Sequence, residues 1–121
     1  MQPDAPPRVL LVEDDVSTGL VLADMLEAAD FAVDGPHRTV SDAMAALAQE
    51  FPDFALLDLR LGRQDSLLVA EDLERYGIDF AFYSGAEREG AVPRHFDHSL
   101  FFRKPFDPAG MIEAVRSATR H

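Results

Sequence analysis

Short apolar runs alternate with longer amphipathic runs along most of this chain, and this alternation restricts its fold more than any other feature. The apolar runs, such as RVLLV at 8–12 and FALLD at 54–58, are typical of strands that are buried on both faces. The longer runs carry apolar residues three or four positions apart, as one side of a helix does. Such an order favours a single α/β domain, in which right-handed crossovers build a parallel sheet with helices on both faces.

The pattern predicts five strands and four full helices. Ser17 is the predicted N-cap of the first helix, and Phe51 is predicted on the buried face of the second. A further helix within 86–98, the fourth in chain order, is expected to be short or irregular, because Gly90 and Pro93 leave room for about one turn. The predicted strands are 8–12, 31–35, 54–58, 79–85 and 99–102, and the full helices are 17–30, 39–51, 66–76 and one that starts at Asp107-Pro108.

Composition excludes several classes of protein. The length of 121 residues suits one domain, and the proline-rich residues 1–7 are predicted to be a flexible lead-in to a domain at 8–121. A formal net charge of −11 argues against nucleic-acid partners, although solubility alone explains most of that charge. No apolar stretch reaches the about 20 residues that span a bilayer, and no signal-peptide pattern opens the chain. A cytoplasmic location without a membrane partner is therefore the default expectation.

Polar side chains follow the predicted strands at their carboxyl ends. Glu13 and Asp14 follow the first strand, and Asp58 ends the third. Ser84 and Lys104 follow the fourth and fifth strands. Because the carboxyl ends of parallel strands meet at one edge of a sheet, these side chains are expected to lie close together.

That edge would gather carboxylates, a hydroxyl and an ammonium group. Three carboxylates in one crevice repel one another, and a hard cation such as Mg²⁺ relieves the repulsion. Lys104 adds a positive charge suited to a phosphoryl group, and Ser84 adds a hydrogen-bond donor. Asp58 is then a candidate nucleophile, since carboxylates form aspartyl-phosphate intermediates. The pattern predicts phosphoryl transfer onto Asp58.

Each of these signals alone can be explained by an ordinary structural role. Acids after a strand stabilise the start of the next helix, and a lone aspartate is a common cap or turn residue. Ser-Gly is a frequent turn dipeptide, and Lys-Pro is frequent on surfaces. The specific feature is the order in which the acidic pair, the single acid, the hydroxyl and the lysine follow successive strands.

This combination resembles the receiver domain of two-component response regulators, from RVLLVEDD to FFRKPFDPAGMIEAV. The resemblance implies a flavodoxin-like, doubly wound sheet with strand order 2-1-3-4-5. It implies that Asp58 is the phosphoacceptor and that Glu13 and Asp14 hold Mg²⁺, which Mn²⁺ can replace. Asp58 and the backbone carbonyl of Arg60 complete the implied metal site.

The resemblance also implies a switch and a set of partners. Ser84 matches the switch hydroxyl, and Lys104 matches the family lysine, with Pro105 after it as a cis-proline candidate. Phe101 matches the aromatic residue that changes rotamer. The phosphodonor would be a histidine kinase or a histidine phosphotransfer protein, and the domain would catalyse its own phosphorylation and dephosphorylation without being an enzyme in the usual sense. A homodimer through the last helix and strand stays open, as does the identity of the downstream protein.

Three positions depart from the family pattern. Gly62 stands where a proline is usual, Ser66 where a glycine is usual, and Gly85 where an alanine is usual. The sequence FYSG at 82–85 resembles the FATG variant of a subgroup of single-domain receivers, mostly alphaproteobacterial. Because no output domain follows residue 121, the expectation is a stand-alone receiver that signals by protein binding or onward phosphotransfer.

Two other functions remain open at this point. A receiver-like module could bind its partner through residues 86–106 without phosphorylation. An aspartate-nucleophile phosphatase is the more remote alternative, since Arg60 stands where such enzymes need a second aspartate and the chain has no room for their cap domain. His95 and His98 form an HxxH pair that lacks a third ligand, so a metal site there is disfavoured.

Overall fold

The computed structural model describes residues 5–84, 96, 100–103 and 107–120. The main sheet comprises β1 (Arg8–Val12), β2 (Ala32–His37), β3 (Phe54–Asp58), β6 (Asp79–Ser84) and β7 (Leu100–Arg103). The helices are α1 (Val16–Ala28), α2 (Val40–Gln49), α3 (Leu67–Arg75) and α4 (Pro108–Thr119). Two short strands, β4 (Arg60–Leu61) and β5 (Gln64–Asp65), form a hairpin. The sheet is parallel with the order β2-β1-β3-β6-β7, which confirms the predicted order 2-1-3-4-5.

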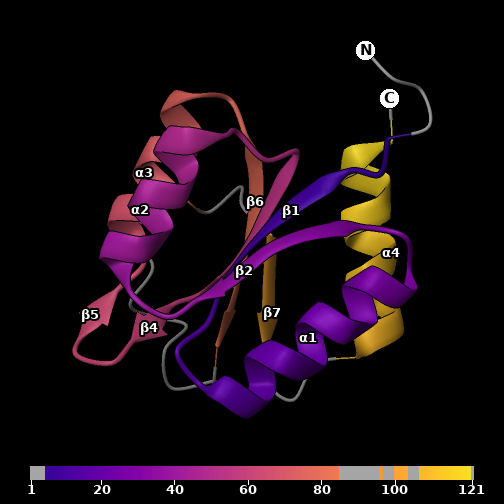
Figure 1. The fold of residues 1–121 in the computed structure, drawn as a ribbon, viewed down its shortest axis with the longest axis horizontal. Helices are drawn as coiled ribbons and strands as arrows, with labels where there is room; N and C mark the ends of the chain where they lie inside the picture. The colour runs from indigo at the N-terminus through magenta and orange to yellow at the C-terminus, as the bar shows by residue number, and fades with distance from the viewer. Residues whose placement is uncertain (1–4, 85–95, 97–99, 104–106, 121) are drawn as a thin grey trace.

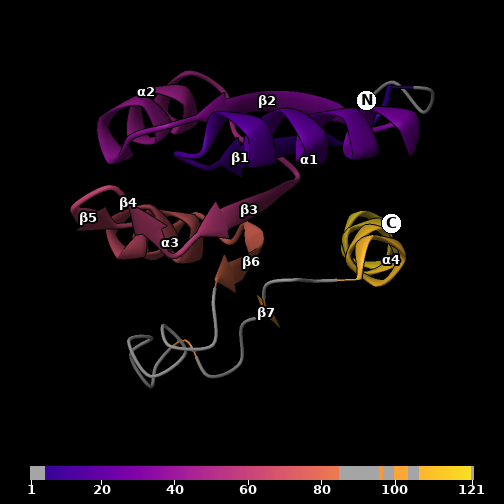
Figure 2. The same ribbon diagram turned by 90° about the horizontal axis from the view of Figure 1, so that it is seen from below.

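Helices cover both faces of the sheet, as the alternation of runs predicts. Figure 1 shows α2 and α3 on one face and α1 and α4 on the other, and Figure 2 shows the same layers from below. The central strand β3 is buried along its whole length. Leu57 packs in the core beneath α2 and α3, whereas Leu56 packs in the core beneath α1 and α4. Each central strand must therefore be apolar on both sides, which explains the continuous apolar runs.

The first helix begins at a different residue from the one predicted. Asp15, not Ser17, is the N-cap of α1, and its Oδ2 accepts hydrogen bonds from the Thr18 N–H at 2.8 Å and the Thr18 hydroxyl at 2.7 Å. The extended backbone of Asp15 lets its carboxylate reach the free N–H groups of the first turn. Ser17 already lies inside that turn, so the prediction for Ser17 was wrong.

The second helix ends earlier than predicted. α2 stops at Gln49, and Phe51 is 55% exposed instead of lying on the buried face. Because a residue that precedes proline is pushed out of the helical region, Pro52 ends the helix before Phe51. The Phe51 ring stacks on Tyr76 with 4.7 Å between the ring centroids.

The second strand extends past its predicted end at Gly-Pro. β2 continues through the cis Gly35–Pro36 bond to His37, whose carbonyl accepts a hydrogen bond from the Glu13 N–H at 2.9 Å. Gly35 has φ +129°, and a side chain there would collide with the Leu11 carbonyl oxygen. β2 thus runs alongside β1 and is still hydrogen-bonded to the chain at Glu13, the first acidic residue after β1.

Two features of the fold were not predicted. The hairpin of β4 and β5 follows Asp58 directly, and its turn contains Gly62 with φ +62°. Its strands have two residues each, too few to give a periodic signal. Phe96 is buried, and its ring meets those of Phe80 and Phe82 edge-on at 5.8 and 5.6 Å. The rest of the predicted irregular segment 86–98 and residues 1–4 of the predicted lead-in lie outside the described residues.

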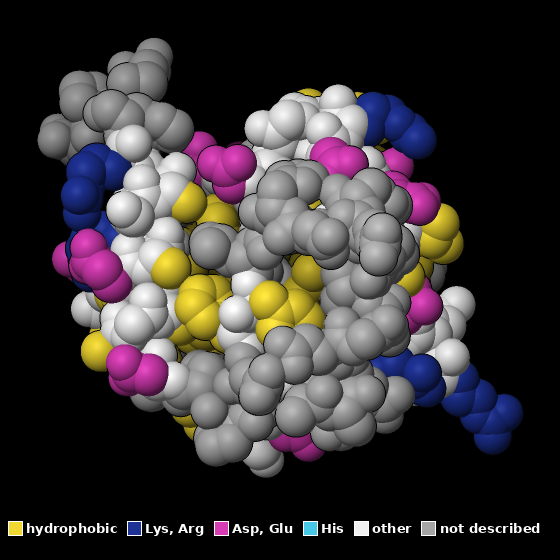
Figure 3. Space-filling view, turned by 180° about the vertical axis from the view of Figure 1, so that it is seen from behind, with side chains coloured by type: hydrophobic (Ala, Val, Ile, Leu, Met, Phe, Trp, Pro, Cys, Tyr) yellow, Lys and Arg dark blue, Asp and Glu magenta, His cyan; other side chains and the backbone are white. Residues whose placement is uncertain are grey.

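The last strand, β7, brings aromatic side chains towards the surface. Figure 3, which views the molecule from behind Figure 1, shows hydrophobic side chains exposed near the centre of that face. Phe101 and Phe102 are half-buried and pack in opposite cores, one on each side of the sheet. Phe80 and Phe82 on β6 are thus buried, whereas the two phenylalanines on β7 are only partly buried. None of the described helices is long and apolar enough to cross a bilayer.

The contact between α1 and β2 leads to a stability prediction at Gly19. An alanine Cβ there would lie 2.8 Å from Cγ of Pro36 and 2.9 Å from its Cβ. Glycine to alanine in a helix interior normally stabilises by about 1 kcal/mol. Because the proline ring is rigid, we expect Gly19→Ala instead to lower the free energy of unfolding by about 1–3 kcal/mol, measured by urea denaturation. Ser17→Ala, at an exposed position of the same helix, is the control, and a stabilised Gly19→Ala protein would contradict the prediction.

Candidate metal centre

Three carboxylates meet where β1 and β3 end. Glu13, Asp14 and Asp58 each offer an oxygen, and these oxygens all lie within 4.8 Å of one another. The register of the sheet causes this, because Val12 on β1 pairs with Leu57 on β3. The structure therefore brings together the three acids that the sequence placed at one edge. An all-oxygen set of this size fits a hard divalent cation such as Mg²⁺.

Glu13 is the most deeply buried of the three acids, with 1% of its surface exposed. Its Oε1 accepts a hydrogen bond from the Tyr83 hydroxyl at 2.9 Å, and its Oε2 accepts one from the Asp15 N–H at 3.0 Å. Two donors thus hold one buried carboxylate, which offsets part of the cost of burying its charge. Sequence reasoning missed Tyr83, although a tyrosine inside an otherwise apolar strand was a usable signal.

Asp14 lies half-buried at the start of the β1–α1 turn. Its Oδ2 accepts a hydrogen bond from the Gly62 N–H at 2.8 Å, and its backbone carbonyl accepts one from Arg38 Nε at 3.2 Å. The first bond ties the hairpin of β4 and β5 to the carboxylate of a predicted metal ligand. The second ties the segment after β2 to the same turn.

Asp58 ends β3 with 5% of its surface exposed. Its Oδ1 accepts a long hydrogen bond of 3.3 Å from the Arg60 N–H, and the Arg60 residue itself is exposed. Asp58 pairs in register with Tyr83, so the next residue on β6, Ser84, lies at the same edge of the sheet and is buried. Metal ligation by the Arg60 carbonyl stays a prediction.

The other predicted site residues divide into two groups. Phe101 lies on β7 beside Phe82, with 6.5 Å between the ring centroids. Lys104 and the cis-proline candidate Pro105 lie outside the described residues, as do Gly85, His95 and His98. The described part of the predicted site therefore consists of the three acids, Arg60, Ser84 and Phe101.

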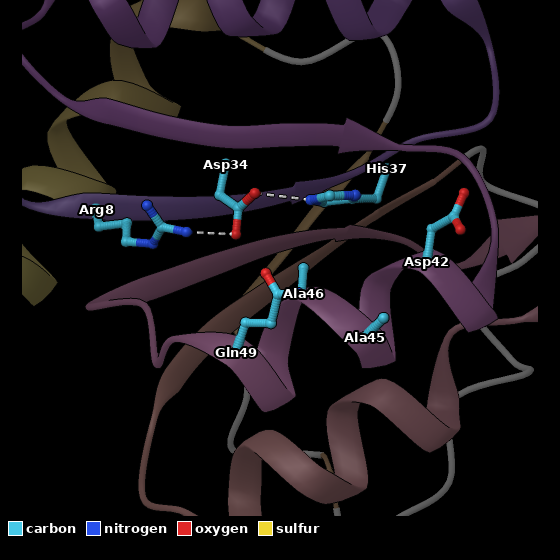
Figure 4. Close-up of a pocket in the computed structure, with 7 residues that line it drawn as sticks. All are labelled: Arg8, Asp34, His37, Asp42, Ala45, Ala46 and Gln49. Atoms are coloured by element: carbon cyan, nitrogen blue, oxygen red, sulfur yellow. Dashed lines mark hydrogen bonds and ion pairs between the residues drawn. The ribbon is translucent and has the colours of Figure 1, made fainter.

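A separate pocket of about 240 Å³ opens beside β2, away from the acidic cluster (Figure 4). Figure 4 shows Asp34 between Arg8 and His37, with Arg8 Nη2 at 2.7 Å and His37 Nε2 at 2.8 Å from its carboxylate oxygens. Arg8 Nε, in contrast, is buried without a hydrogen-bond partner among the described residues. Because the Asp34 carboxylate is already bonded to two neighbours, the pocket gives less support for a reactive site than the acidic cluster does.

Comparisons with known proteins agree with this fold, although no protein-family model matches the sequence. The transcriptional activator protein IrlR of Burkholderia pseudomallei is 29% identical over 116 residues, which cover 93% of this chain and 50% of IrlR. The solution structure of SdrG from Sphingomonas melonis Fr1 is 31% identical, with a TM-score of 0.80 and coverage of 97% of this chain and 99% of SdrG. The non-phosphorylated HemR receiver domain from Leptospira biflexa is 27% identical, with a TM-score of 0.80 and 95% of each chain covered.

The chain is a response regulator receiver domain. It spans about half the length of the curated relatives that it matches, and nearly all of the solved SdrG chain. Among the described residues, the acidic cluster at the carboxyl edge of its sheet is the group that could hold a metal ion.

Two departures of this receiver domain from the family pattern lie beside the cluster. Gly62 replaces a proline, which has no N–H, and its own N–H is the donor to Asp14. Ser66 replaces a glycine and is fully buried just before α3, where its hydroxyl has no hydrogen-bond partner among the described residues. The first departure adds a polar contact to the site, and nothing in the structure explains the second.

Tyr83 of the receiver domain gives a prediction for alkaline pH. Burial, and next the charge of Glu13, raise the pKa of its phenol far above the usual value near 10. Above pH 10 the unfolded chain loses this proton while the folded chain keeps it, so the free energy of unfolding falls as the pH rises. One such group contributes a slope of about 1.4 kcal/mol per pH unit.

Urea denaturation from about pH 8 to about pH 11 measures this effect. We expect the decline above pH 10 to be shallower in Tyr83→Phe than in the wild type by that slope. Tyr76→Phe, the same change at an exposed tyrosine, is the matched control. Equal slopes for the wild type and Tyr83→Phe would show that the buried phenol is not the cause.

Proposed function

We propose that this receiver domain accepts a phosphoryl group onto Asp58, in a Mg²⁺-dependent reaction, from a phosphohistidine on a kinase or a phosphotransfer protein. The observation that carries the proposal is the position of Asp58, a nearly buried carboxylate that shares one edge of the sheet with Glu13 and Asp14. Within this receiver fold, the acidic cluster is better suited to phosphoryl transfer than any other group of described residues.

Glu13, Asp14 and Asp58 are the residues that would hold the cation, together with the carbonyl of Arg60. Bound Mg²⁺, or Mn²⁺ in its place, would supply positive charge to the acidic cluster and to the incoming phosphoryl oxygens. The hydrogen bonds from Tyr83 and Gly62 orient two of these carboxylates before any ligand arrives.

The chemical step forms a bond between an Asp58 carboxylate oxygen and phosphorus while the phosphorus–nitrogen bond of phosphohistidine breaks. The electron pair of that bond goes to the imidazole, which leaves with its partner protein. Later attack by water on the same phosphorus returns Asp58 and releases inorganic phosphate, so the domain would catalyse its own dephosphorylation. Because Asp58 is only 5% exposed, the fold limits how much water reaches it.

Phosphorylation would be transmitted through the adjacent strands. The Ser84 hydroxyl would donate to a phosphoryl oxygen, with Lys104 pairing with the same group. Phe101, which is half-buried, would then turn into the space that Ser84 leaves. A full reversal of the two-state population from 1:99 to 99:1 requires about 5.5 kcal/mol of differential stabilisation, and a partial switch requires less.

The output of this switch would be contact with another protein or onward phosphotransfer, in the cytoplasm. The net charge of −11 is unfavourable for direct nucleic-acid binding by these residues. An aspartate-nucleophile phosphatase is less well supported, since the exposed Arg60 stands where the second catalytic aspartate would be needed.

Intact-mass spectrometry after incubation with acetyl phosphate or phosphoramidate and Mg²⁺ tests the proposal. We expect the wild type to gain one phosphoryl group, and EDTA to prevent the gain because the acidic cluster then holds no cation. Asp58→Asn should gain none, because the amide is not a nucleophile of this kind.

Asp79→Asn is the matched control, because Asp79 is exposed and begins β6 at the opposite end of the strands. We expect this variant to be phosphorylated like the wild type. If folded wild-type protein gains no phosphoryl group from any donor, the proposal is wrong, and phosphorylation-independent partner binding becomes the better account.

A further inference from the structure

Tyr83 places a hydroxyl inside the core that α1 and α4 cover. The residue is fully buried on β6, one position before Ser84, and its hydroxyl donates to Glu13 Oε1 at 2.9 Å. The Val12 carbonyl oxygen lies 3.3 Å from the same hydroxyl. The ring alone would fill this part of the core, so packing does not account for the oxygen.

The Glu13 carboxylate has defined contacts on both of its oxygens. Tyr83 donates to Oε1, and the Asp15 N–H donates to Oε2. A carboxylate oxygen can accept more than one partner, so both bonds are compatible with metal ligation. Together they fix the rotation of the carboxylate about its last bond, and the oxygens reach within 4.8 Å of those of Asp14 and Asp58.

We infer that Tyr83 is a positioning residue for the cation site, and that it acts through Glu13. The inference rests on the proposed function, because it concerns the same acidic cluster. The Tyr83 hydroxyl keeps the Glu13 carboxylate turned towards Asp14 and Asp58, and so prepares the site for a divalent cation. Groups outside the ligand set that orient a ligand commonly change metal affinity by about 10- to 100-fold.

Two effects oppose each other when the hydroxyl is removed. A carboxylate with one donor fewer attracts a cation more strongly, which would tighten binding. However, a carboxylate that is 1% exposed has little water to replace the lost donor, so it lowers its free energy by turning towards another donor or towards solvent. This rotation withdraws Glu13 from the cluster. We therefore expect weaker binding.

The test measures Mg²⁺ dissociation constants by competition with Mn²⁺, whose free ion is counted by electron paramagnetic resonance. We expect Tyr83→Phe to bind Mg²⁺ about tenfold more weakly than the wild type. Tyr76→Phe makes the same change at a tyrosine that is 47% exposed, and its affinity should stay at the wild-type value. Circular dichroism melting in EDTA confirms that each variant is folded before it is titrated.

A double-mutant cycle separates positioning from a general structural effect. In a Glu13→Gln background, the added Tyr83→Phe change should leave the Mg²⁺ dissociation constant unaltered, because Tyr83 acts only through Glu13. An equal loss in both backgrounds would overturn the inference, since Tyr83 would then affect the site by another route.

The remaining outcomes also decide the matter. Wild-type affinity in Tyr83→Phe overturns the inference and leaves the proposed function standing. If the folded wild type itself binds no Mg²⁺ at millimolar concentrations, the proposed metal site fails and the inference fails with it. The wild-type titration therefore distinguishes the two failures.

Discussion

Mutual repulsion among three carboxylates is the constraint on which the rest of this structure depends. Glu13, Asp14 and Asp58 lie within 4.8 Å of one another at the edge of a sheet whose interior is apolar. The fold tolerates this because each acid accepts at least one hydrogen bond from a donor on a different part of the chain or in the adjacent turn. The central strands supply the rigidity that keeps the acids together, since β3 is buried along its whole length.

The strands and the acidic cluster were accessible from the sequence for a simple physical reason, whereas the order of the strands came from the resemblance to receiver domains. Strands buried on both faces must be apolar at every position, so each one stands out, and the first polar residue after it marks the edge of the sheet. Asp58 after FALLD is the clearest instance, and Glu13 after RVLLV is another. The resemblance to receiver domains then assigned roles that the spacing alone could not. The register of the sheet confirms that the acids meet, whereas their roles in metal binding and phosphoryl transfer remain proposals.

The features that sequence reasoning missed depend on contacts between residues far apart in the chain or on very short elements. The bond from Tyr83 to Glu13 joins residues that are 70 positions apart, and no local pattern encodes it. The hairpin after Asp58 has strands of two residues, below the length at which alternation is visible. Asp15 and Ser17 both belong to residue types that cap helices well, and the extended backbone of Asp15 makes it the N-cap of α1.

The hydrogen bond from Gly62 to Asp14 has a consequence for how any experiment on this site is interpreted. It means that the hairpin of β4 and β5 and the β1–α1 turn that carries Asp14 share one polar contact of 2.8 Å. Asp14→Ala would remove a carboxylate of the proposed cation site and would also remove the acceptor of the Gly62 N–H, which would loosen the hairpin next to Asp58. Loss of partner binding in such a variant would therefore have two separable origins, chemical and conformational. A proline at position 62 would have no N–H to donate, so the conformational origin depends on the glycine that stands there in this chain.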